Sequence, residues 1–178
     1  MKPFLEETFL ITEEDYVNMS LERKKLLIPK KNRMIVLAAG IFALCAGVMG
    51  MIFLRNSLYH AFSYIVLILL GMYAISYYDV VDRSLIRKSA SDFYTVNQKA
   101  LHSQTIRIYD SKLEILSENR RLRIPRSFIY QIAEGNTSVI IFLDKNEFIF
   151  FPKRIITEPQ LEKLRAFGGD QYKKIEVR

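Results

Sequence analysis

Residues that carry most enzyme chemistry are scarce in this sequence. Its 178 residues include one cysteine, two histidines and no tryptophan. A lone cysteine, Cys45, builds neither a disulfide framework nor a cysteine-ligated zinc site. His60 and His102 have no second histidine, cysteine or spaced acid beside them, and no serine stands in a nucleophile-elbow context. No glycine-rich loop of the kind that cradles phosphates is present. We therefore expect a protein that is not an enzyme, with no catalytic residue, no metal site and no cofactor.

Charge is missing from two long apolar stretches, residues 34–54 and 58–78. A helix rises about 1.5 Å per residue, so a run of about 20 apolar residues matches the hydrocarbon thickness of a bilayer. Only Arg55, Asn56 and Ser57 separate the two stretches, and so short a link joins two antiparallel helices. We therefore predict a transmembrane hairpin. A hairpin buried in a soluble core is the alternative, but helices in such cores are usually shorter.

Basic residues flank this hairpin on its outer sides, whereas the link between the spans carries Arg55 alone. They are Lys24, Lys25, Lys30, Lys31 and Arg33 before the first span, and Arg83, Arg87 and Lys88 after the second. Positively charged flanks stay on the cytoplasmic side of a membrane. The sequence therefore predicts a multi-pass membrane protein with both its N-terminus and its C-terminus in the cytoplasm.

Neither span contains an Asp, Glu, Lys or Arg. Ion pathways are usually marked by charge inside the membrane, so the pattern indicates an anchor rather than a transporter or channel. Small residues let helices approach closely. The candidate helix-packing residues are Ala39, Ala43, Gly47 and Gly50 in the first span and Gly71 and Ala74 in the second. We expect them to pack the two spans together, with a homo-oligomer as the alternative.

Residues 1–33 form a predicted N-terminal cytoplasmic segment with a short strand and a helix. Alternation over residues 4–11 favours a strand, and Thr12 followed by three acidic residues favours a helix start. The stripe expected on this helix contains Val17, Leu21, Lys24 and Ile28. After the second span, residues 79–102 contain neither glycine nor proline and predict a linker helix.

Alternation with a period of two then replaces helical spacing, and polar turns separate the alternating stretches. The predicted strands are residues 105–109, 112–116, 120–125, 128–133, 138–143 and 147–151. Tight turns between them favour an antiparallel meander. Thr157, Pro159 and Gln160 predict a capped helix start, and Gly168 and Gly169 predict its end. The fold class is therefore α+β. A small antiparallel half-barrel closed by a C-terminal helix, pleckstrin-homology-like in outline, is expected over residues 103–170, followed by a tail of residues 171–178.

The chain is basic, with a net charge of +7. Arg121 and Arg123 share one face of an alternating strand, while Leu122 and Ile124 point to the core. The candidate residues for binding an anionic lipid or a protein partner are Arg121, Arg123, Arg126, Lys153 and Arg154. Arginine grips phosphate through paired hydrogen bonds, and anionic lipid is the nearest polyanion to a tethered domain. No nucleic-acid partner is therefore expected. An ordinary solvated sheet face is the alternative.

Four stretches of the sequence are typical of one group of bacterial membrane proteins. They are FLITEEDY at residues 9–16, the helix-forming stretch after the spans, IYQIAE at residues 129–134 and FFPKR at residues 150–154. In these stretches the chain resembles the YcxB-like family. The resemblance implies two linked spans in a bacterial plasma membrane and a C-terminal domain related to bacterial pleckstrin-homology domains. The family's Trp-Ser pair is replaced here by Arg126-Ser127, so any packing by that tryptophan must be done differently.

These features together predict a non-enzymatic integral membrane protein. Its hairpin would hold the pleckstrin-homology-like domain at the cytoplasmic membrane surface, where the domain binds membrane lipids or a protein. The alternative is an accessory subunit of a membrane transporter, or a toxin-immunity protein, that acts through its transmembrane helices.

Overall fold

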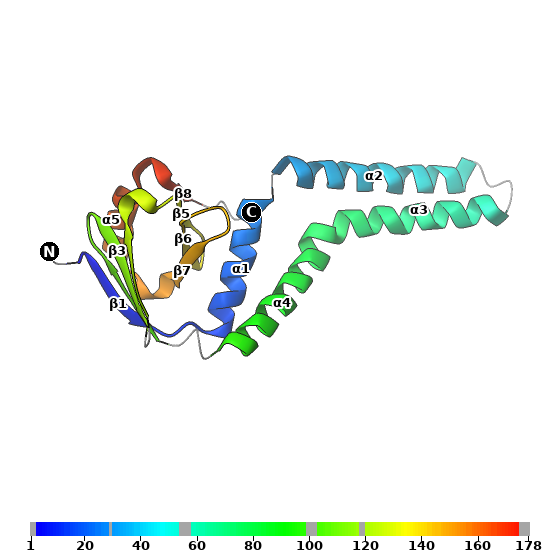
Figure 1. The fold of residues 1–178 in the computed structure, drawn as a ribbon. Helices are drawn as coiled ribbons and strands as arrows, with labels where there is room; N and C mark the ends of the chain where they lie inside the picture. The colour runs from blue at the N-terminus through cyan, green and yellow to red at the C-terminus, as the bar shows by residue number, and fades with distance from the viewer. Residues whose placement is uncertain (1–2, 29, 54–57, 99–102, 118–119, 175–178) are drawn as a thin grey trace. The chain divides into compact units, whose positions relative to one another are not determined.

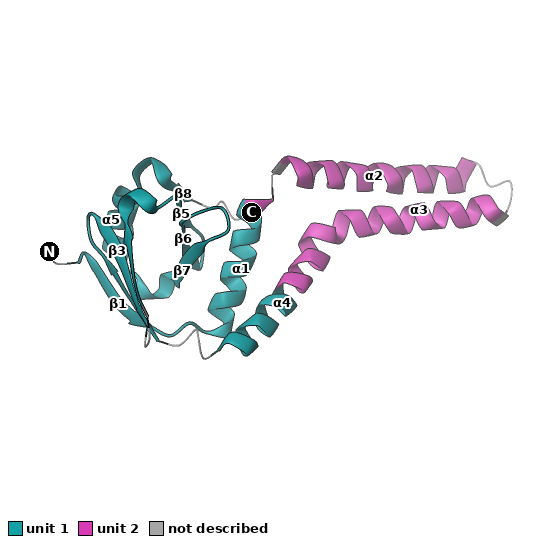
Figure 2. Ribbon diagram, in the orientation of Figure 1, with its two compact units in different colours: residues 1–26, 87–178 teal, residues 27–86 magenta. Residues whose placement is uncertain are grey.

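The computed structural model divides the chain into two parts (Figures 1 and 2). It describes residues 3–28, 30–53, 58–98, 103–117 and 120–174. Residues 1–26 and 87–178 form one part, the sheet unit, and residues 27–86 form the other, the hairpin unit. The sequence led us to expect a separate N-terminal segment, but these residues do not form a region of their own. Its first 26 residues belong with the C-terminal half of the chain.

The first sheet of the sheet unit combines one strand that precedes the hairpin in the sequence with three strands that follow it. Its order is β1 (Leu5–Phe9), β2 (Gln104–Ile108), β3 (Lys112–Ser117) and β4 (Arg120–Pro125), and all neighbours are antiparallel. β1 pairs with β2 from Leu5 opposite Ile108 to Phe9 opposite Gln104. Alternation buries Leu5 and Phe9 in the core. The strand predicted near the N-terminus is confirmed, and its partner β2 follows the hairpin in the sequence.

The second sheet has the order β7 (Phe148–Pro152), β6 (Ser138–Phe142), β5 (Gln131–Glu134) and β8 (Tyr172–Lys174). All five residues of β6 are buried, so both of its faces are covered. The expected single antiparallel meander is wrong in two respects. The strands divide between two sheets, and β8, which the sequence placed in a tail, runs parallel to β5. The strand expected at residues 128–133 also starts late, because Arg126–Phe128 form a 3-10 turn.

The C-terminal helix α5 (Glu158–Gly168) confirms the boundaries predicted for it. The backbone N–H of Thr157 donates to Oε1 of Gln160 at 2.8 Å, which forms half of the capping box. Gly169 ends the helix with a φ of +51°, a conformation that favours glycine. Leu161, Leu164 and Phe167 are buried, as their helical spacing predicts.

The N-terminal helix α1 (Glu13–Leu27) packs on the sheet unit through a different stripe from the one expected. Met19 and Glu22 are its buried residues, and Met19 joins the core cluster that also contains Ile141 and Phe151. Val17 and Leu21 are only half-buried. The expected stripe is wrong because one of the two buried residues is a glutamate, and apolar spacing alone does not identify a charged residue as buried.

The hairpin unit consists of α2 (Lys30–Phe53), α3 (Leu58–Ser76), a π-helical turn (Tyr77–Val81) and the start of α4 (Asp82–Asn97). Two helical segments, residues 31–53 and 59–97, are long and apolar enough to cross a membrane, as judged by length and composition. Large apolar side chains on them are exposed, including Phe42 at 75% and Phe62 at 68%. Within the linker helix expected over residues 79–102, the helical residues run to Asn97 and are followed by Gln98. Residues 99–102 lie outside the described residues.

Glycines line the contact between α2 and α3. A β-carbon at Gly71 would lie 2.7 Å from the Leu44 nitrogen and 2.8 Å from the Gly40 oxygen, so the two backbones meet there. Gly47 and Gly50 are buried against α3, and Ala74 faces Gly40. Four of the expected packing residues therefore lie within the hairpin contact: Gly47, Gly50, Gly71 and Ala74. Ala43 is half-buried, whereas Ala39 is exposed and does not belong to the contact.

Candidate functional site: cations around two buried carboxylates

The β3–β4 hairpin gathers three cations around one buried carboxylate. Glu114 lies opposite Arg123 in the strand register, and its side chain is 1% exposed. Lys112 Nζ donates to Glu114 at 2.8 Å and Arg121 Nη2 donates at 3.0 Å. Arg123 Nε lies 3.1 Å from Oε1 of the same carboxylate. We call this group the β3–β4 basic face. Three cations and one carboxylate leave it a net charge of +2.

The charge state of Glu114 follows from these contacts. Hydrogen bonds from Lys112 and Arg121 hold the pKa of Glu114 at about 2, well below its ordinary value of 4.5. The carboxylate is therefore ionised throughout the physiological range. Arg121 and Arg123 nevertheless keep 51% and 58% of their side chains exposed. Their guanidinium groups are thus fixed in place by Glu114 and still accessible to an anion from solvent.

A second buried carboxylate, Glu134 on β5, joins four elements of the sheet unit. It accepts hydrogen bonds from Lys153 at 2.7 Å, from Arg165 of α5 at 3.1 Å and from the hydroxyl of Tyr172 on β8. Burial alone would raise the pKa of Glu134, but these donors lower it to about 2. Burial and the bond to Glu134 raise the pKa of Tyr172. Lys153 and Arg165 are therefore committed to a structural cluster.

The other predicted basic residues also have partners within the sheet unit. Arg154 Nη2 lies 2.7 Å from Oδ2 of Asp15 and 2.9 Å from the Leu10 carbonyl oxygen. Burial raises the pKa of Asp15, but the hydrogen bonds from Arg154 and Thr12 together outweigh burial and lower the pKa. The Arg126 guanidinium lies 5.1 Å from the ring centroid of Phe167. Arg154 thus fastens α1 to the segment after β7.

The structure consequently divides the five cations that the sequence grouped together. Arg121 and Arg123 meet on Glu114, whereas Lys153 and Arg154 bind other carboxylates of the sheet unit. Sequence reasoning missed Lys112 and Glu114. The signal was available, because strands 112–116 and 120–125 were predicted as neighbours and their antiparallel register places Glu114 opposite Arg123.

Large apolar side chains are exposed close to this face along the chain. Phe128 is 70% exposed, Tyr130 is 57% exposed, and both follow β4 directly. Leu122, which alternation predicted as a core residue, is 47% exposed, unlike Ile124. The prediction for Leu122 is wrong because its place on the inner side of β4 is not covered. The segment from β4 to β5 therefore carries exposed cations and exposed aromatic rings together.

The low pKa values of Glu114 and Glu134 predict acid unfolding of the sheet unit. A carboxylate with a lowered folded-state pKa stabilises the fold above its unfolded pKa, and this stability is lost as the pH falls through the folded pKa. We therefore expect the Tm of the full chain in a non-ionic detergent to fall between pH 4.5 and pH 2. Glu134→Gln should flatten the fall in this window. An equally steep fall in that variant would contradict the assignment.

Comparison of the chain with family models, with curated proteins and with solved structures gives no match. Within the described residues no three His, Cys, Asp or Glu side chains gather in a way that could hold a metal ion. His60 lies on α3 and is exposed, and His102 lies outside the described residues. The described site presents partly exposed guanidinium groups with an excess of positive charge, which suit electrostatic contact with an anion.

Proposed function

We propose that the chain is a non-enzymatic membrane protein whose α2–α3 hairpin crosses the bilayer and whose sheet unit binds anionic lipid headgroups at the cytoplasmic surface. An acidic protein surface would suit the same cations. The observation that carries the proposal is the pairing of β1 with β2. Because β1 precedes the hairpin and β2 follows it, the chain must enter and leave the hairpin on the same side of the membrane.

The exposed apolar surface of α2 and α3 supports a membrane location. Only 17% of the most apolar window of the first helix and 6% of that of the second are buried. Core helices of soluble proteins are largely buried, so the low burial of these two supports an apolar solvent around them. The basic residues outside the hairpin then favour the cytoplasmic side for the sheet unit.

The strand order supports a pleckstrin-homology-like fold for the sheet unit. One four-stranded antiparallel sheet, β1 to β4, is followed by the antiparallel strands β5, β6 and β7 and then by α5. On this proposal the transmembrane hairpin is an insertion between the first and second strands of such a fold. The parallel strand β8 is an addition at its C-terminal end.

The β3–β4 basic face supports binding of an anionic surface. Its net charge is positive, and Glu114 orders its arginines in advance, which lowers the entropy lost when a phosphate binds. The exposed rings of Phe128 and Tyr130 suit the headgroup region, where amphipathic aromatic side chains gather. Arg121 and Arg123 are therefore the residues that we expect to contact phosphate.

A polarity-sensitive dye at position 127 tests this proposal. We would attach it to Ser127→Cys in a Cys45→Ser background and reconstitute the full chain in nanodiscs. Anionic lipid should shift the emission to the blue relative to zwitterionic lipid, and salt should reverse the shift because exposed charges are screened. Arg121→Gln with Arg123→Gln should abolish the shift. Lys173→Gln with Lys174→Gln removes the same charge from β8 and should keep it.

The same emission in anionic and zwitterionic nanodiscs would contradict lipid binding by this face. An equal loss of the shift in both double variants would show a response to net charge alone. Circular dichroism checks that the Arg121 and Arg123 variant remains folded, since Glu114 then loses two of the three cations described around it and keeps Lys112.

A further inference from the structure

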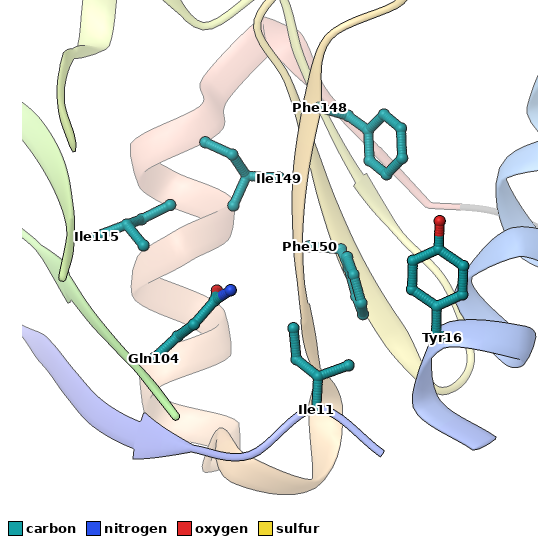
Figure 3. Close-up of a pocket in the computed structure, with 7 residues that line it drawn as sticks. All are labelled: Ile11, Tyr16, Gln104, Ile115, Phe148, Ile149 and Phe150. Atoms are coloured by element: carbon teal, nitrogen blue, oxygen red, sulfur yellow. The ribbon is translucent and has the colours of Figure 1, made fainter. Parts of the chain in front are cut away.

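A cavity of about 290 Å³ lies along β7 in the sheet unit (Figure 3). It is lined by residues 148–150 of β7, by Ile115 of β3, by Gln104 of β2, by Ile11 and by Tyr16 of α1. Figure 3 shows Ile149 and Ile115 pointing toward each other on one side of β7. On the other side, Phe148 and Phe150 point toward Tyr16. The lining is apolar except for one amide and one phenol.

A cation with an unused donor lies against this wall. The Arg23 guanidinium lies 4.1 Å from the ring centroid of Phe148. Arg23 follows Tyr16 by two helical turns and so shares its face of α1. Its Nε is buried without a hydrogen-bond partner, the one such side-chain atom found in the described part of the chain. Buried donors without a partner are rare in folded proteins, and each one requires an explanation.

The polar groups near the cavity are suited to an anion. Burial raises the pKa of Tyr16, although the nearby charge of Arg23 acts in the opposite direction, so the phenol is a neutral donor at physiological pH. Arg23 supplies a permanent positive charge. No carboxylate is among the residues that line the cavity. A ligand with an anionic end would therefore find donors here and no like charge.

The cavity reaches both sides of β7, which is the edge strand of its sheet. We infer that it binds a single-chain amphiphilic carboxylate, a fatty acid, that passes the edge of β7, with its acyl chain between Ile115 and Ile149 and its carboxylate near Arg23 and Tyr16. The apolar lining requires an apolar body for the ligand. A volume of about 290 Å³ is at the small end for ligand sites, which suits one unbranched chain and not a two-chain lipid. The Arg23 guanidinium against the Phe148 ring and the Tyr16 phenol in the lining favour an anionic end. This site is separate from the β3–β4 basic face and does not depend on lipid binding there.

Photolabelling of the full chain in phosphatidylcholine vesicles tests the inference. The probe is a fatty acid with a diazirine near its methyl end, and the matched probe is the fatty alcohol of the same chain. The acid should label residues around Ile115 and Ile149, and the alcohol should label them at least about ten-fold less, because it lacks the charge-assisted hydrogen bonds. This comparison uses the wild-type chain and needs no variant to fold.

Variants then assign the two ends of the ligand. Arg23→Gln should reduce labelling by the acid to the level of the alcohol, and Arg23→Lys should restore part of it. Arg107→Gln, which removes a cation paired with Glu6 elsewhere on the first sheet, should change nothing. Labelling confined to α2 and α3, equal labelling by both probes, or full labelling of the folded Arg23→Gln variant would each overturn the inference.

Discussion

Replacing Glu22 by alanine is expected to destabilise the sheet unit by about 3 kcal/mol, since several donors to a charged acceptor are lost together. The Glu22 carboxylate, buried on α1, holds the turn between β5 and β6. It accepts the backbone N–H groups of Asn136 at 2.7 Å, Thr137 at 2.9 Å and Ser138 at 3.2 Å. The hydroxyls of Thr137 and Ser138 also donate to it. Without the carboxylate, these donors lose their acceptor in a largely dry contact.

Hydrogen exchange of the full chain in detergent micelles measures this effect in the right place. Amides of β5 and β6 should exchange about 100-fold faster in Glu22→Ala if local opening becomes easier by about 3 kcal/mol. Glu14→Ala, an exposed acid on the same helix, is the matched control and should leave exchange unchanged. Unchanged protection of β5 and β6 in Glu22→Ala would show that the carboxylate does not hold the turn.

Gly135 provides an independent check of the same contact. A β-carbon at this position would collide with the Glu22 carboxylate. Gly135→Ala should therefore weaken the same turn by expelling the carboxylate. In the double variant with Glu22→Ala the two losses should not add, because the second change removes an interaction that the first has already broken. Additive losses would mean that the two residues act separately.

Replacing Glu134 by alanine is the second change with a large expected effect. It removes the common acceptor of Lys153, Arg165 and Tyr172, and with it the side-chain contacts that join α5 and β8 to β5. Breaking a buried ion pair by removing one partner costs about 3–5 kcal/mol. Lys153 and Arg165 are partly exposed and can regain water, so we expect about 3 kcal/mol, the lower end of that range.

Glu158→Ala is the matched control for Glu134→Ala. Glu158 binds the same Arg165 at 3.3 Å, but its side chain is 69% exposed. An exposed ion pair contributes about 0–1 kcal/mol. Chemical denaturation of the full chain in micelles should therefore separate the two variants clearly, and hydrogen exchange should show the loss in α5 and β8. Equal effects of the two variants would contradict the structural role assigned to the buried carboxylate.

Local patterns in the sequence predicted the parts of the fold that depend on local interactions. The start of α5 follows from Thr157 and Gln160, which contact each other three residues apart, and its end follows from Gly169. The strands β3 and β4 follow from alternation in the sequence before and after Glu118 and Asn119. The pairing of Glu114 with Arg123 could also have been derived from these two strands. This part of the β3–β4 basic face was therefore predictable from the sequence.

Contacts between distant residues could not be predicted in this way. Glu22 binds backbone groups more than a hundred positions away, and nothing next to it in the sequence indicates a buried carboxylate. β1 and β2 pair although the whole hairpin separates them in the sequence. β1 was therefore assigned to a separate N-terminal segment. β8 is three residues long and polar, and it becomes a strand only because β5 offers a free edge. The contact of Arg23 with Phe148 likewise joins residues far apart in the sequence and could not be predicted from local patterns.

The central claim is that the hairpin crosses the membrane and that both of its flanks lie on the cytoplasmic side. The pairing of β1 with β2 underlies this claim, and one measurement of topology tests it directly. Cys45 is the only cysteine of the chain, so Cys45→Ser gives a clean background for single cysteines. Asn56→Cys lies in the link between the spans, Glu14→Cys lies before the hairpin and Ser127→Cys lies after it. A membrane-impermeant maleimide on intact cells should label Asn56→Cys alone, and it should label the other two only after permeabilisation. Labelling of all three positions from one side, or of Glu14→Cys and Ser127→Cys from opposite sides, would contradict a hairpin that crosses the membrane and returns.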